Sequence, residues 1–312
     1  MATMQAVRIH EYGGTDELKL ETVPRPMPGP NEALIKVHAA GVNPVDAKAR
    51  GGALRGFWDF KFPFIPGWDF SGIVEESGEG VTDLENGHPV YGYLGLNHEG
   101  AYAEYITAPV SIITSKPPSL SHAEAAAVPL AALTAWQSLF DTAGLSPGQK
   151  VLIHAAAGGV GSFAVQLAKW KGAYVIGTAS KSNHALLEEL GVDQIIDYNS
   201  VRFDKVVENV DVVFDTVGGD VQERSWKTLK PGGILVSITS DPSEARAKQL
   251  GLRCAWLLVQ PSCSQLEELT QLIESGKLKV ILDKTYPLSQ AADAHNQIES
   301  GHTRGKIALT MV

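Results

Sequence analysis

Cysteine is scarce in this sequence, with Cys254 and Cys263 the only two residues of that type among 312. Two thiols are too few for a disulfide framework or for a four-cysteine structural zinc loop, and their spacing matches no metal signature. We therefore expect both to be reduced structural thiols.

The sequence also lacks a basic run and a long apolar run. The 26 Lys and Arg residues are outnumbered by 35 Asp and Glu residues, which gives a formal net charge of −9. This balance offers no electrostatic footprint for a phosphate backbone, so we expect no nucleic-acid partner. No stretch is long and apolar enough to span a bilayer, and the N-terminus has no secretory-signal pattern. A cytoplasmic protein with no membrane partner is the default expectation.

What is present fits a globular protein. Hydrophobic residues make up 44% and charged residues 20% of the chain, and the length is sufficient for two domains with substantial cores. We find no internal repeat and no low-complexity tract.

A glycine-rich turn is the most informative stretch. It lies between a short apolar strand pattern at 150–153 and a helix pattern that continues to residue 169. Ala156, Gly158 and Gly161 follow the spacing of the dinucleotide fingerprint G-x-G-x-x-G, with alanine in the first place. Missing side chains let backbone N–H groups approach a pyrophosphate, and Gly161 lets the helix pack close to the strand. A purely structural turn is the alternative, because the pattern alone is weak evidence.

The strand pattern at 173–180 bears on the choice of cofactor. An NAD-binding unit carries Asp or Glu near the end of this strand to bind the ribose hydroxyls, and no carboxylate stands there. Ser180, Lys181, Asn183 and His184 instead offer donors suited to a 2′-phosphate. We infer NADPH rather than NADH, with an ordinary solvated lysine as the alternative for Lys181.

The remaining patterns predict two kinds of architecture. Strand patterns within 4–42, at 87–93 and at 100–106 predict a β-rich, barrel-like first domain. Ser121 and Glu124 have the spacing of a capping box, which predicts a helix running on to about residue 140. Beyond the glycine turn, strand and helix patterns alternate, which is typical of a doubly wound parallel sheet. The strands are expected at 195–198, 211–217, 233–238 and 252–259, with helices at 182–190, 220–229 and 265–278.

Taken in order, several motifs resemble the medium-chain dehydrogenase/reductase superfamily, and within it the zinc-independent quinone oxidoreductases related to zeta-crystallin. The motifs are GVNPVDAKAR (41–50), PGWDFSG (66–72), AYAEY (101–105), AALTAW (131–136), AAAGGVG (155–161), DTVGG (215–219), LKPGGILV (229–236) and RGKIAL (304–309). The resemblance implies an α/β protein with a GroES-like β-barrel catalytic domain, 1–120 and 279–312, and a Rossmann NADPH-binding domain, 121–278. It also implies that nicotinamide and acceptor meet in the cleft between the domains, and that homodimers form through the last strand of the nucleotide domain.

The same resemblance suggests the site residues. Asn43 and Asp46 are the polar residues of the active-site loop. An ionised Asp46 cannot stabilise an oxyanion directly, so we expect it to orient a neighbour such as Arg50 or Lys48, while Asn43 donates through its amide. Lys48 is a further candidate catalytic donor, and a solvated lysine is the alternative. The expected cofactor contacts are Thr134, Ala157, Gly158, Gly159, Val160, Gly161, Ser180, Lys181, Tyr198, Val217 and Ser237.

We expect no metal. Zinc-dependent relatives carry Cys near the position of Asp46 and His-Glu where this chain has Trp68 and Asp69, and tryptophan cannot ligate zinc. We expect His88 and His98 to be ordinary surface histidines. Without zinc, the acceptor itself must hold developing negative charge, as quinones and enones do by conjugation.

The expected activity is an NADPH-dependent quinone oxidoreductase that transfers hydride from nicotinamide C4 to a quinone. The alternative is an alkenal/enone reductase, because quinone oxidoreductases often carry Tyr where this chain has Lys48. Enoyl-thioester reductases use a tyrosine in the following loop, and residues 51–65 contain none. A protein that binds NADPH as a sensor or structural element, with little turnover, is a possibility from another class.

Overall fold

The structure is a computed structural model that describes residues 2–311. It divides into two compact units. The first comprises the chain up to Leu130, Pro261–Ser275 and the chain from Val280 onward, and the second comprises Ala131–Gln260 and Gly276–Lys279.

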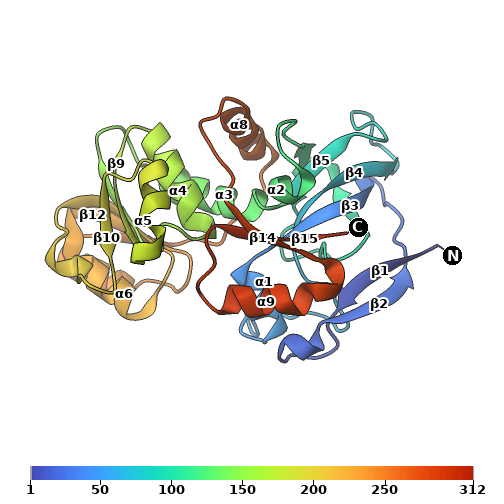
Figure 1. Ribbon diagram of the computed structural model, residues 1–312, viewed down its shortest axis with the longest axis horizontal. Coiled ribbons are helices and arrows are strands. Elements are labelled where there is room, and N and C mark those ends of the chain that lie inside the picture. Colours follow the sequence, from blue (N-terminus) through green and yellow to red (C-terminus); the bar gives the residue numbers. More distant parts are fainter. Residues whose placement is uncertain (1, 312) are drawn as a thin grey trace. The chain divides into compact units, whose positions relative to one another are not determined.

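The first unit is built on a seven-stranded, mainly antiparallel sheet with the path β14-β15-β3-β4-β5-β7, and β6 pairs with β3 (Figure 1). The strands are β3 (Glu32–Val42), β4 (Asp69–Ser77), β5 (Pro89–Tyr93), β6 (Tyr105–Pro109), β7 (Ile113–Ser115), β14 (Leu282–Pro287) and β15 (Lys306–Thr310), with the separate hairpin β1 (Thr3–Arg8) and β2 (Lys19–Pro24). The helices are α1 (Pro44–Arg50), α2 (His122–Ala126), α8 (Cys263–Glu274) and α9 (Ala291–Glu299). Leu34, Ile35 and Val37 of β3 are buried, which makes this long strand the centre of the core.

The second unit holds a six-stranded sheet in the order β10-β9-β8-β11-β12-β13, and every pairing is parallel. The strands are β8 (Lys150–Ile153), β9 (Tyr174–Ala179), β10 (Gln194–Asp197), β11 (Val210–Asp215), β12 (Leu229–Ser237) and β13 (Arg253–Trp256). The helices are α3 (Pro129–Trp136), which begins at the boundary and continues as a π-helix (Gln137–Thr142), α4 (Gly159–Trp170), α5 (His184–Glu189), α6 (Gly219–Ser225) and α7 (Glu244–Leu250). Chain order 3-2-1-4-5-6 is that of a doubly wound nucleotide-binding fold, as predicted.

The compact units differ from the expected domain boundaries in two places. Helix α2 belongs to the first unit because it lies against β3 and β4. Helix α8 also belongs there, since it contacts β7 and its Leu266 carbonyl accepts a hydrogen bond from the Tyr91 hydroxyl at 2.9 Å. Helical periodicity predicted both helices, but it carries no information about which sheet a helix covers.

The long helix expected from Ser121 is interrupted. The capping box is present, with the Glu124 carboxylate accepting the Ser121 N–H at 2.9 Å, but α2 ends at Ala126 and α3 begins at Pro129. Proline lacks an N–H and clashes with the preceding turn, so the helix restarts there. Sequence analysis also missed β14, which pairs in parallel with β15.

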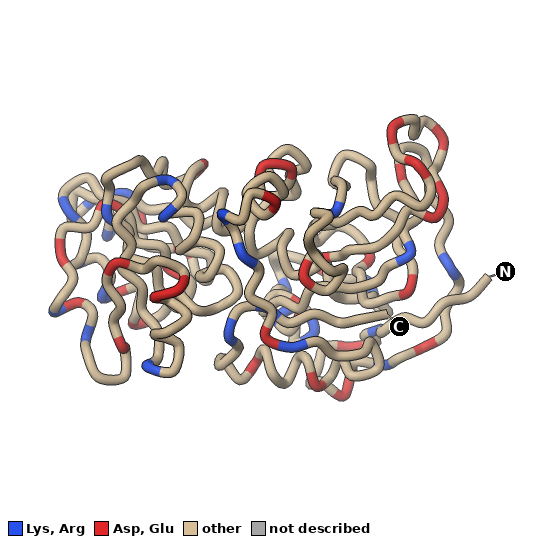
Figure 2. The backbone as a smooth tube through the Cα atoms, turned by 45° about the horizontal axis from the view of Figure 1, so that its top comes forward, with Lys and Arg blue, Asp and Glu red and all other residues tan. Residues whose placement is uncertain are grey.

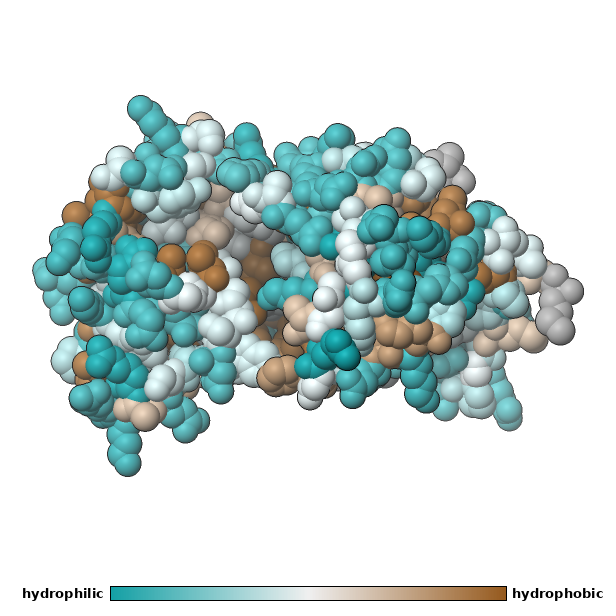
Figure 3. Space-filling model, turned by 90° about the horizontal axis from the view of Figure 1, so that it is seen from below, coloured by the Kyte–Doolittle hydropathy of each residue, from teal (hydrophilic) through white to brown (hydrophobic). Residues whose placement is uncertain are grey.

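Charge and hydropathy are mixed over the surface. Figure 2 shows acidic and basic positions interleaved along the backbone, and the face in Figure 3 is mainly hydrophilic with separate apolar patches. Among the described residues, no helix combines the length and apolar character needed to cross a bilayer.

Candidate active site

The glycine turn of the second unit lies where the strand order of the parallel sheet reverses. β8 stands between β9 and β11, and the turn follows its carboxyl end. Ligands of open parallel sheets bind outside the carboxyl ends of the strands at such a switch point. The turns after Ile153 and after Asp215 therefore border the ligand position expected in this unit.

Helix α4 begins with amide groups that no side chain caps. Gly158 is the N-cap residue in an extended conformation, and among the described residues none supplies a side-chain cap. The first N–H groups of an α-helix have no partner within it, and the peptide dipoles place partial positive charge there. A Cβ at Gly161 would lie 2.3 Å from the Ala155 carbonyl oxygen, so only glycine allows this helix to approach the strand. These residues fit a dinucleotide pyrophosphate.

The turn after β11 is fixed by the buried Asp215 carboxylate. Its Oδ1 accepts the N–H groups of Val217 at 3.0 Å and Gly218 at 2.8 Å, and its Oδ2 accepts from Gln222 at 3.0 Å and from the Ser237 hydroxyl at 2.9 Å. The Val217 side chain is 48% exposed at the tip of this turn. The predicted cofactor residues Val217 and Ser237 are thus held by one carboxylate, and the Ser237 hydroxyl is already donated to it.

The end of β9 gathers polar groups in a short turn. Ser180 Oγ accepts from Asn183 Nδ2 at 3.3 Å and lies 3.0 Å from Ser182 Oγ, and the Lys181 side chain is exposed. Tyr198, which follows the neighbouring strand β10, is 55% exposed. Hydroxyl, amide and ammonium donors within one turn fit a phosphate group.

Sequence analysis overlooked a carboxylate beside this turn. Asp197 ends β10 and pairs with Ala179 at the end of β9. The N–H of Asn199 donates to its Oδ1 at 3.0 Å, and this bond holds the pKa of Asp197 below its ordinary range. The signal was available in the sequence, because parallel register brings the end of the next strand to the same edge. A carboxylate at this edge is the kind of group that binds the ribose hydroxyls of NADH, which makes NADH the alternative cofactor.

His154 is a second residue of this unit that sequence analysis did not single out. Its ring lies between Thr178 Oγ1, 3.2 Å from Nδ1, and Ser225 Oγ, 2.9 Å from Nε2. Burial lowers the pKa of His154 to about 4, so a neutral imidazole links β8 to β9 and α6. Near it in sequence, Ala157 is buried in the turn, as Thr134 is in α3.

In the first unit, the start of α1 brings Asn43 and Asp46 together. Pro44 occupies the first helical position, where a missing N–H is tolerated. The Asn43 N–H donates to Asp46 Oδ2 at 2.8 Å, and the Asp46 N–H donates back to the Asn43 main-chain oxygen at 3.0 Å. Asn43 is 2% and Asp46 0% exposed, so the predicted pair forms one buried turn.

The side chain of Asn43 extends this turn to Asp69 and Lys306. Its Nδ2 donates to Asp69 Oδ2 at 2.9 Å, and its Oδ1 accepts from Lys306 Nζ. Lys306 Nζ also donates to the Val42 carbonyl at 2.9 Å and lies 3.9 Å from Asp69 Oδ2, while the Leu130 N–H donates to Asp69 Oδ1 at 2.7 Å. We expected the Asn43 amide to donate to the substrate, but one of its N–H groups is already donated to Asp69 within the protein.

Tyr102 connects Asp46 to His295. The Tyr102 hydroxyl donates to Asp46 Oδ2 at 3.0 Å, and His295 Nε2 lies 3.3 Å from the same hydroxyl oxygen. Arg50 donates to His295 Nδ1 at 3.0 Å and to Glu299 at 2.7 Å. Because arginine only donates, Nδ1 of His295 accepts and Nε2 carries the hydrogen that points to Tyr102.

These contacts correct one expectation. We expected Asp46 to orient Arg50 or Lys48, but its hydrogen bonds go to Asn43 and Tyr102, and Arg50 is held by His295 and Glu299. The Lys48 side chain is exposed on α1. A role for Lys48 as donor to the acceptor stays a prediction.

Burial dominates the titration of this cluster. It raises the pKa of Asp46 to about 7 and that of Asp69 to about 6, although hydrogen bonds to both carboxylates and the nearby Lys306 pull the values down. Burial also lowers the pKa of Lys306 and lowers that of His295 to about 3. The pKa of Tyr102 lies well above its ordinary value, for the same reason and because of Asp46. Such concentrated perturbation is typical of functional sites.

Glycines explain why three of the sequence motifs occur together. A Cβ at Gly41 would lie 2.4 Å from the Ala126 oxygen and 2.9 Å from Asp69 Cβ. Gly67 has φ +81°, and a Cβ there would meet the Tyr102 ring at 2.2 Å. The motifs GVNPVD, PGWD and AYAEY thus touch one another around the buried cluster. Sequence analysis quoted these motifs but could not place Tyr102, Lys306 and His295 in one cluster with Asn43 and Asp46.

The donor set of this cluster is a poor match for zinc. Trp68 Nε1 donates to the His98 carbonyl at 3.0 Å, and a lysine ammonium group lies beside Asp69. A neighbouring cation repels a divalent ion, and neither side chain can ligate one. Within residues 2–311, no three His, Cys, Asp or Glu side chains are grouped as metal ligands.

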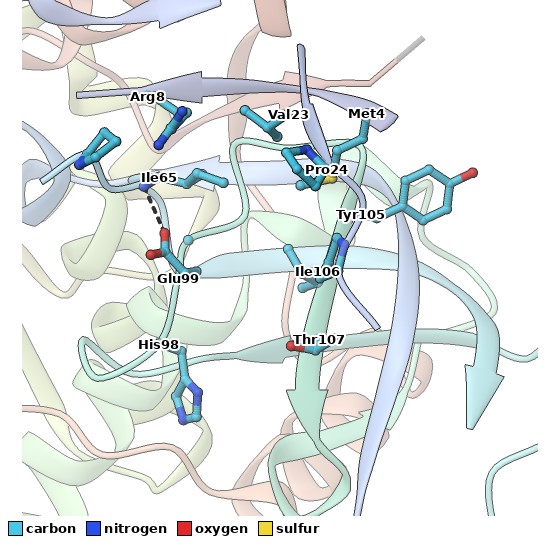
Figure 4. A pocket seen from close by; sticks show the side chains of 13 residues that line it. Met4, Arg8, Val23, Pro24, Ile65, His98, Glu99, Tyr105, Ile106 and Thr107 are labelled. Carbon is cyan, nitrogen blue, oxygen red and sulfur yellow. Dashed lines mark hydrogen bonds between the residues drawn. The ribbon is translucent and has the colours of Figure 1, made fainter. Parts of the chain in front are cut away.

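A separate pocket of about 320 Å³ opens on the first unit between the β1–β2 hairpin and β6 (Figure 4). Its lining includes Met4, Arg8, Val23 and Ile106, and the Glu99 carboxylate at its wall accepts the Ile65 N–H at 3.0 Å. None of the residues predicted for the site lines this pocket.

Two family models match the chain: an alcohol dehydrogenase GroES-like domain over residues 29–118 and a zinc-binding dehydrogenase over 190–309. A chloroplastic quinone-oxidoreductase homolog from Spinacia oleracea is 35% identical over 98% of both chains. An NADPH-dependent alkenal/one oxidoreductase from Arabidopsis thaliana, also chloroplastic, is 36% identical over 98% of this chain and 79% of its own. The solved quinone oxidoreductase from Coxiella burnetii is 40% identical, with TM-score 0.92 and full coverage of both chains.

A GroES-like unit and a doubly wound unit with a glycine turn define an oxidoreductase of the alcohol-dehydrogenase type. The chain belongs to the medium-chain dehydrogenase/reductase superfamily, as its motifs indicated.

Proposed function

We propose that this protein is an NADPH-dependent oxidoreductase that reduces quinones without zinc. The observation that carries the proposal is the uncapped start of α4 at the switch point of the parallel sheet, a backbone site for a dinucleotide pyrophosphate. When bound, NADPH supplies the hydride. Everything else that the chain contributes is binding, orientation and proton supply.

The residues that would hold NADPH follow from the second unit. The amides of Gly159, Val160 and Gly161 would bind the pyrophosphate, with Gly158 allowing its close approach. Ser180 and Lys181 would bind the 2′-phosphate, and Tyr198 would contact the adenosine. Thr134, Ala157, Val217 and Ser237 would complete the set on the nicotinamide side. The NADPH-dependent Arabidopsis relative supports this assignment.

Zinc independence is supported by the first unit. The indole of Trp68 and the ammonium group of Lys306 occupy the cluster around Asp69, and neither can serve as a metal ligand. An acceptor reduced here must delocalise negative charge itself, which favours quinones and α,β-unsaturated carbonyls over simple alcohols and ketones.

Enone reduction is the alternative activity. Relatives of this chain carry both names, quinone oxidoreductase and alkenal/one oxidoreductase, at nearly equal identity. Lys48, exposed on α1, is the residue of the active-site loop that could donate to an enone oxygen. Loss of enone but not quinone turnover in Lys48→Ala would support that role, and unchanged turnover of both would exclude it.

The test is a comparison of acceptors. Purified protein is given NADPH or NADH with a panel of quinones and a panel of short enals and enones, and nicotinamide oxidation is followed. We expect multiple turnovers with quinones and NADPH. Preference for enones would replace the main proposal with the alternative, and absence of turnover with tight NADPH binding would favour a sensor or structural role. Zinc analysis of the same sample tests metal independence.

We also propose a homodimer joined at the second unit. β13 is the last strand in its sheet, and Trp256 and Leu258 near it are 40% and 41% exposed. An open edge strand with apolar neighbours is a common pairing surface. Sedimentation analysis should give a dimer, and Leu258→Lys should shift it toward monomer.

A further inference from the structure

The buried cluster of the first unit contains one carboxylate, Asp46, that forms no ion pair among the described residues. Arg50 is paired with Glu299 at 2.7 Å, and Lys306 faces Asp69 at 3.9 Å. Asp46 has no such partner among the described residues, and its donors, the Asn43 amide and the Tyr102 hydroxyl, are neutral. An ionised Asp46 would therefore add a second buried negative charge, which Lys306, already facing Asp69, balances only in part, and this is costly.

The two oxygens of Asp46 differ in their surroundings. Oδ2 accepts the Asn43 N–H at 2.8 Å and the Tyr102 O–H at 3.0 Å, so both hydrogens point at it and a proton is disfavoured there. Oδ1 is buried and has no hydrogen-bond partner among the described residues. A carboxylate with this asymmetry takes its proton on Oδ1.

From this geometry we propose that Asp46 is protonated on Oδ1 in the resting protein and supplies the proton that accompanies hydride transfer. The proposal rests on the reductase function above and extends it to the second hydrogen of the reaction. It also changes the role expected for Asp46 from an orienting carboxylate to an acid.

The proton step balances with the hydride. Hydride brings two electrons and one hydrogen to the quinone or enone, which leaves negative charge on the acceptor oxygen. The O–H bond at Asp46 Oδ1 breaks, the proton bonds to that oxygen, and Asp46 becomes a carboxylate. Water returns a proton to Asp46 before the next turnover. Transfer requires hydrogen-bond distance or one intervening water.

Groups on every neighbouring element bear on this proton. Asp69 on β4 is a like charge that favours it, and Lys306 on β15 opposes it. Tyr102 opposes it by donating to the ionised form, while neutral His295 on α9 holds the Tyr102 oxygen. Tyr93 on β5 interacts electrostatically with Asp46 but stays neutral, because burial raises its pKa. Arg50 and Glu299 form a paired charge behind His295.

Two substitutions with opposite effects provide the test. Tyr102→Phe removes a hydrogen bond to the ionised form, so the midpoint for loss of the proton should rise. Asp69→Asn removes a like charge and leaves Lys306 unpaired, so the midpoint should fall. A purely structural role for these residues would destabilise both variants without moving the midpoint in opposite directions. Tyr102 and Asp69 are positioning residues in this proposal.

The first readout is carbon NMR of aspartate carboxyl groups in the protein without added ligand. The resonance missing from Asp46→Asn should titrate near neutral pH in the wild type, higher in Tyr102→Phe and lower in Asp69→Asn. A resonance that titrates in the ordinary acidic range would overturn the proposal, whatever the enzyme does. This measurement needs no turnover and so is independent of the proposed function.

The second readout is the pH profile of kcat with the best acceptor. The wild-type rate should fall as pH rises through the NMR midpoint, and the two positioning variants should move that fall in the same directions. Asp46→Asn should lose about 100-fold or more and show no such pH dependence. Asp220→Asn, an exposed carboxylate of α6, is the matched control and should resemble the wild type. Full activity in Asp46→Asn would overturn the delivery step. Absence of turnover with every acceptor would overturn the reductase function, and the delivery step with it.

Discussion

The two units present different chemical groups at their candidate sites. The second unit offers backbone amides at the start of α4, made accessible by glycines and aimed by the strand order of one sheet. The first unit offers ionisable side chains drawn from β4, α1, β15, α9 and the loop before β6, all buried together. Neutral amides cost less to desolvate than ions do, whereas a buried ionic cluster is stable only while each charge keeps its partner.

This difference predicts where substitutions are most damaging. Lys306→Met should destabilise the protein by about 3–5 kcal/mol, because Asp69 then remains as a buried charge without its cation. Denaturant unfolding measures the loss. The double variant Asp69→Asn, Lys306→Met should recover most of it, since no unpaired charge is left.

An exposed pair of the second unit is the control. Lys279 lies 3.0 Å from Glu189, with both side chains more than half exposed. Lys279→Met should therefore cost less than about 1 kcal/mol. Equal losses at Lys279 and Lys306 would mean that burial does not distinguish the two pairs.

The sequence predicted the backbone site of the second unit better than the side-chain cluster of the first. The glycine turn and the parallel sheet depend on residues close together in sequence, and periodicity with motif spacing predicted both, although the strand expected at 211–217 ends at Asp215. The buried cluster depends on contacts between residues 43, 69, 102, 295 and 306. The family resemblance predicted Asn43 and Asp46 as site residues. Which distant residues contact them cannot be deduced from one sequence. Asp46 was consequently assigned the wrong neighbour.

Gly161→Ala tests the backbone site of the second unit. The added Cβ would lie 2.3 Å from the Ala155 oxygen and 2.8 Å from Ala156 Cα, both rigid backbone atoms. We expect a loss of about 1–3 kcal/mol in stability, and at least about tenfold in NADPH affinity as α4 shifts from the strand. Calorimetric unfolding and fluorescence titration measure the two effects.

Gly158→Ala separates crowding of the fold from crowding of the ligand. Its Cβ would lie 3.2 Å from the Ala155 oxygen, a milder contact. Stability should fall less than in Gly161→Ala, while NADPH affinity still declines, since Gly158 faces the ligand. If Gly158→Ala lost more stability than Gly161→Ala, the packing argument for Gly161 would be wrong.

One titratable group in each unit should affect stability with opposite dependence on pH. The folded-state pKa of Asp46 is raised from 3.8 to about 7, so its contribution to stability is complete below 3.8 and is lost as pH rises from there to about 7. The pKa of His154 is lowered from 6.5 to about 4, so its contribution is lost as pH falls from 6.5 toward 4. The slopes reach at most about 1.4 kcal/mol per pH unit for each group.

Difference curves isolate the two groups. Wild-type minus Asp46→Asn unfolding free energy should decrease with pH, and wild-type minus His154→Gln should increase. The raw wild-type curve is less informative, because burial lowers the pKa of His122 and His295 as well. Two difference curves with the same sign would contradict the assignment of opposite protonation states to the two sites.

The smallest expected effect concerns Lys181, in the turn after β9 where the second unit is expected to distinguish NADPH from NADH. Lys181→Ala should weaken NADPH binding by about tenfold, or about 1.4 kcal/mol, and leave NADH binding unchanged, because only NADPH carries the 2′-phosphate that an exposed ammonium group can contact. Lys171→Ala is the matched control, since that lysine lies over Phe140 and Trp170 and should affect neither cofactor. If NADH binds more tightly than NADPH to the wild type, the Asp197 carboxylate at the same edge becomes the ribose partner. The charge of the Asp197 side chain would then select the cofactor in the second unit. Side-chain charges would thus determine ligand choice in that unit, as they determine the protonation of Asp46 in the first.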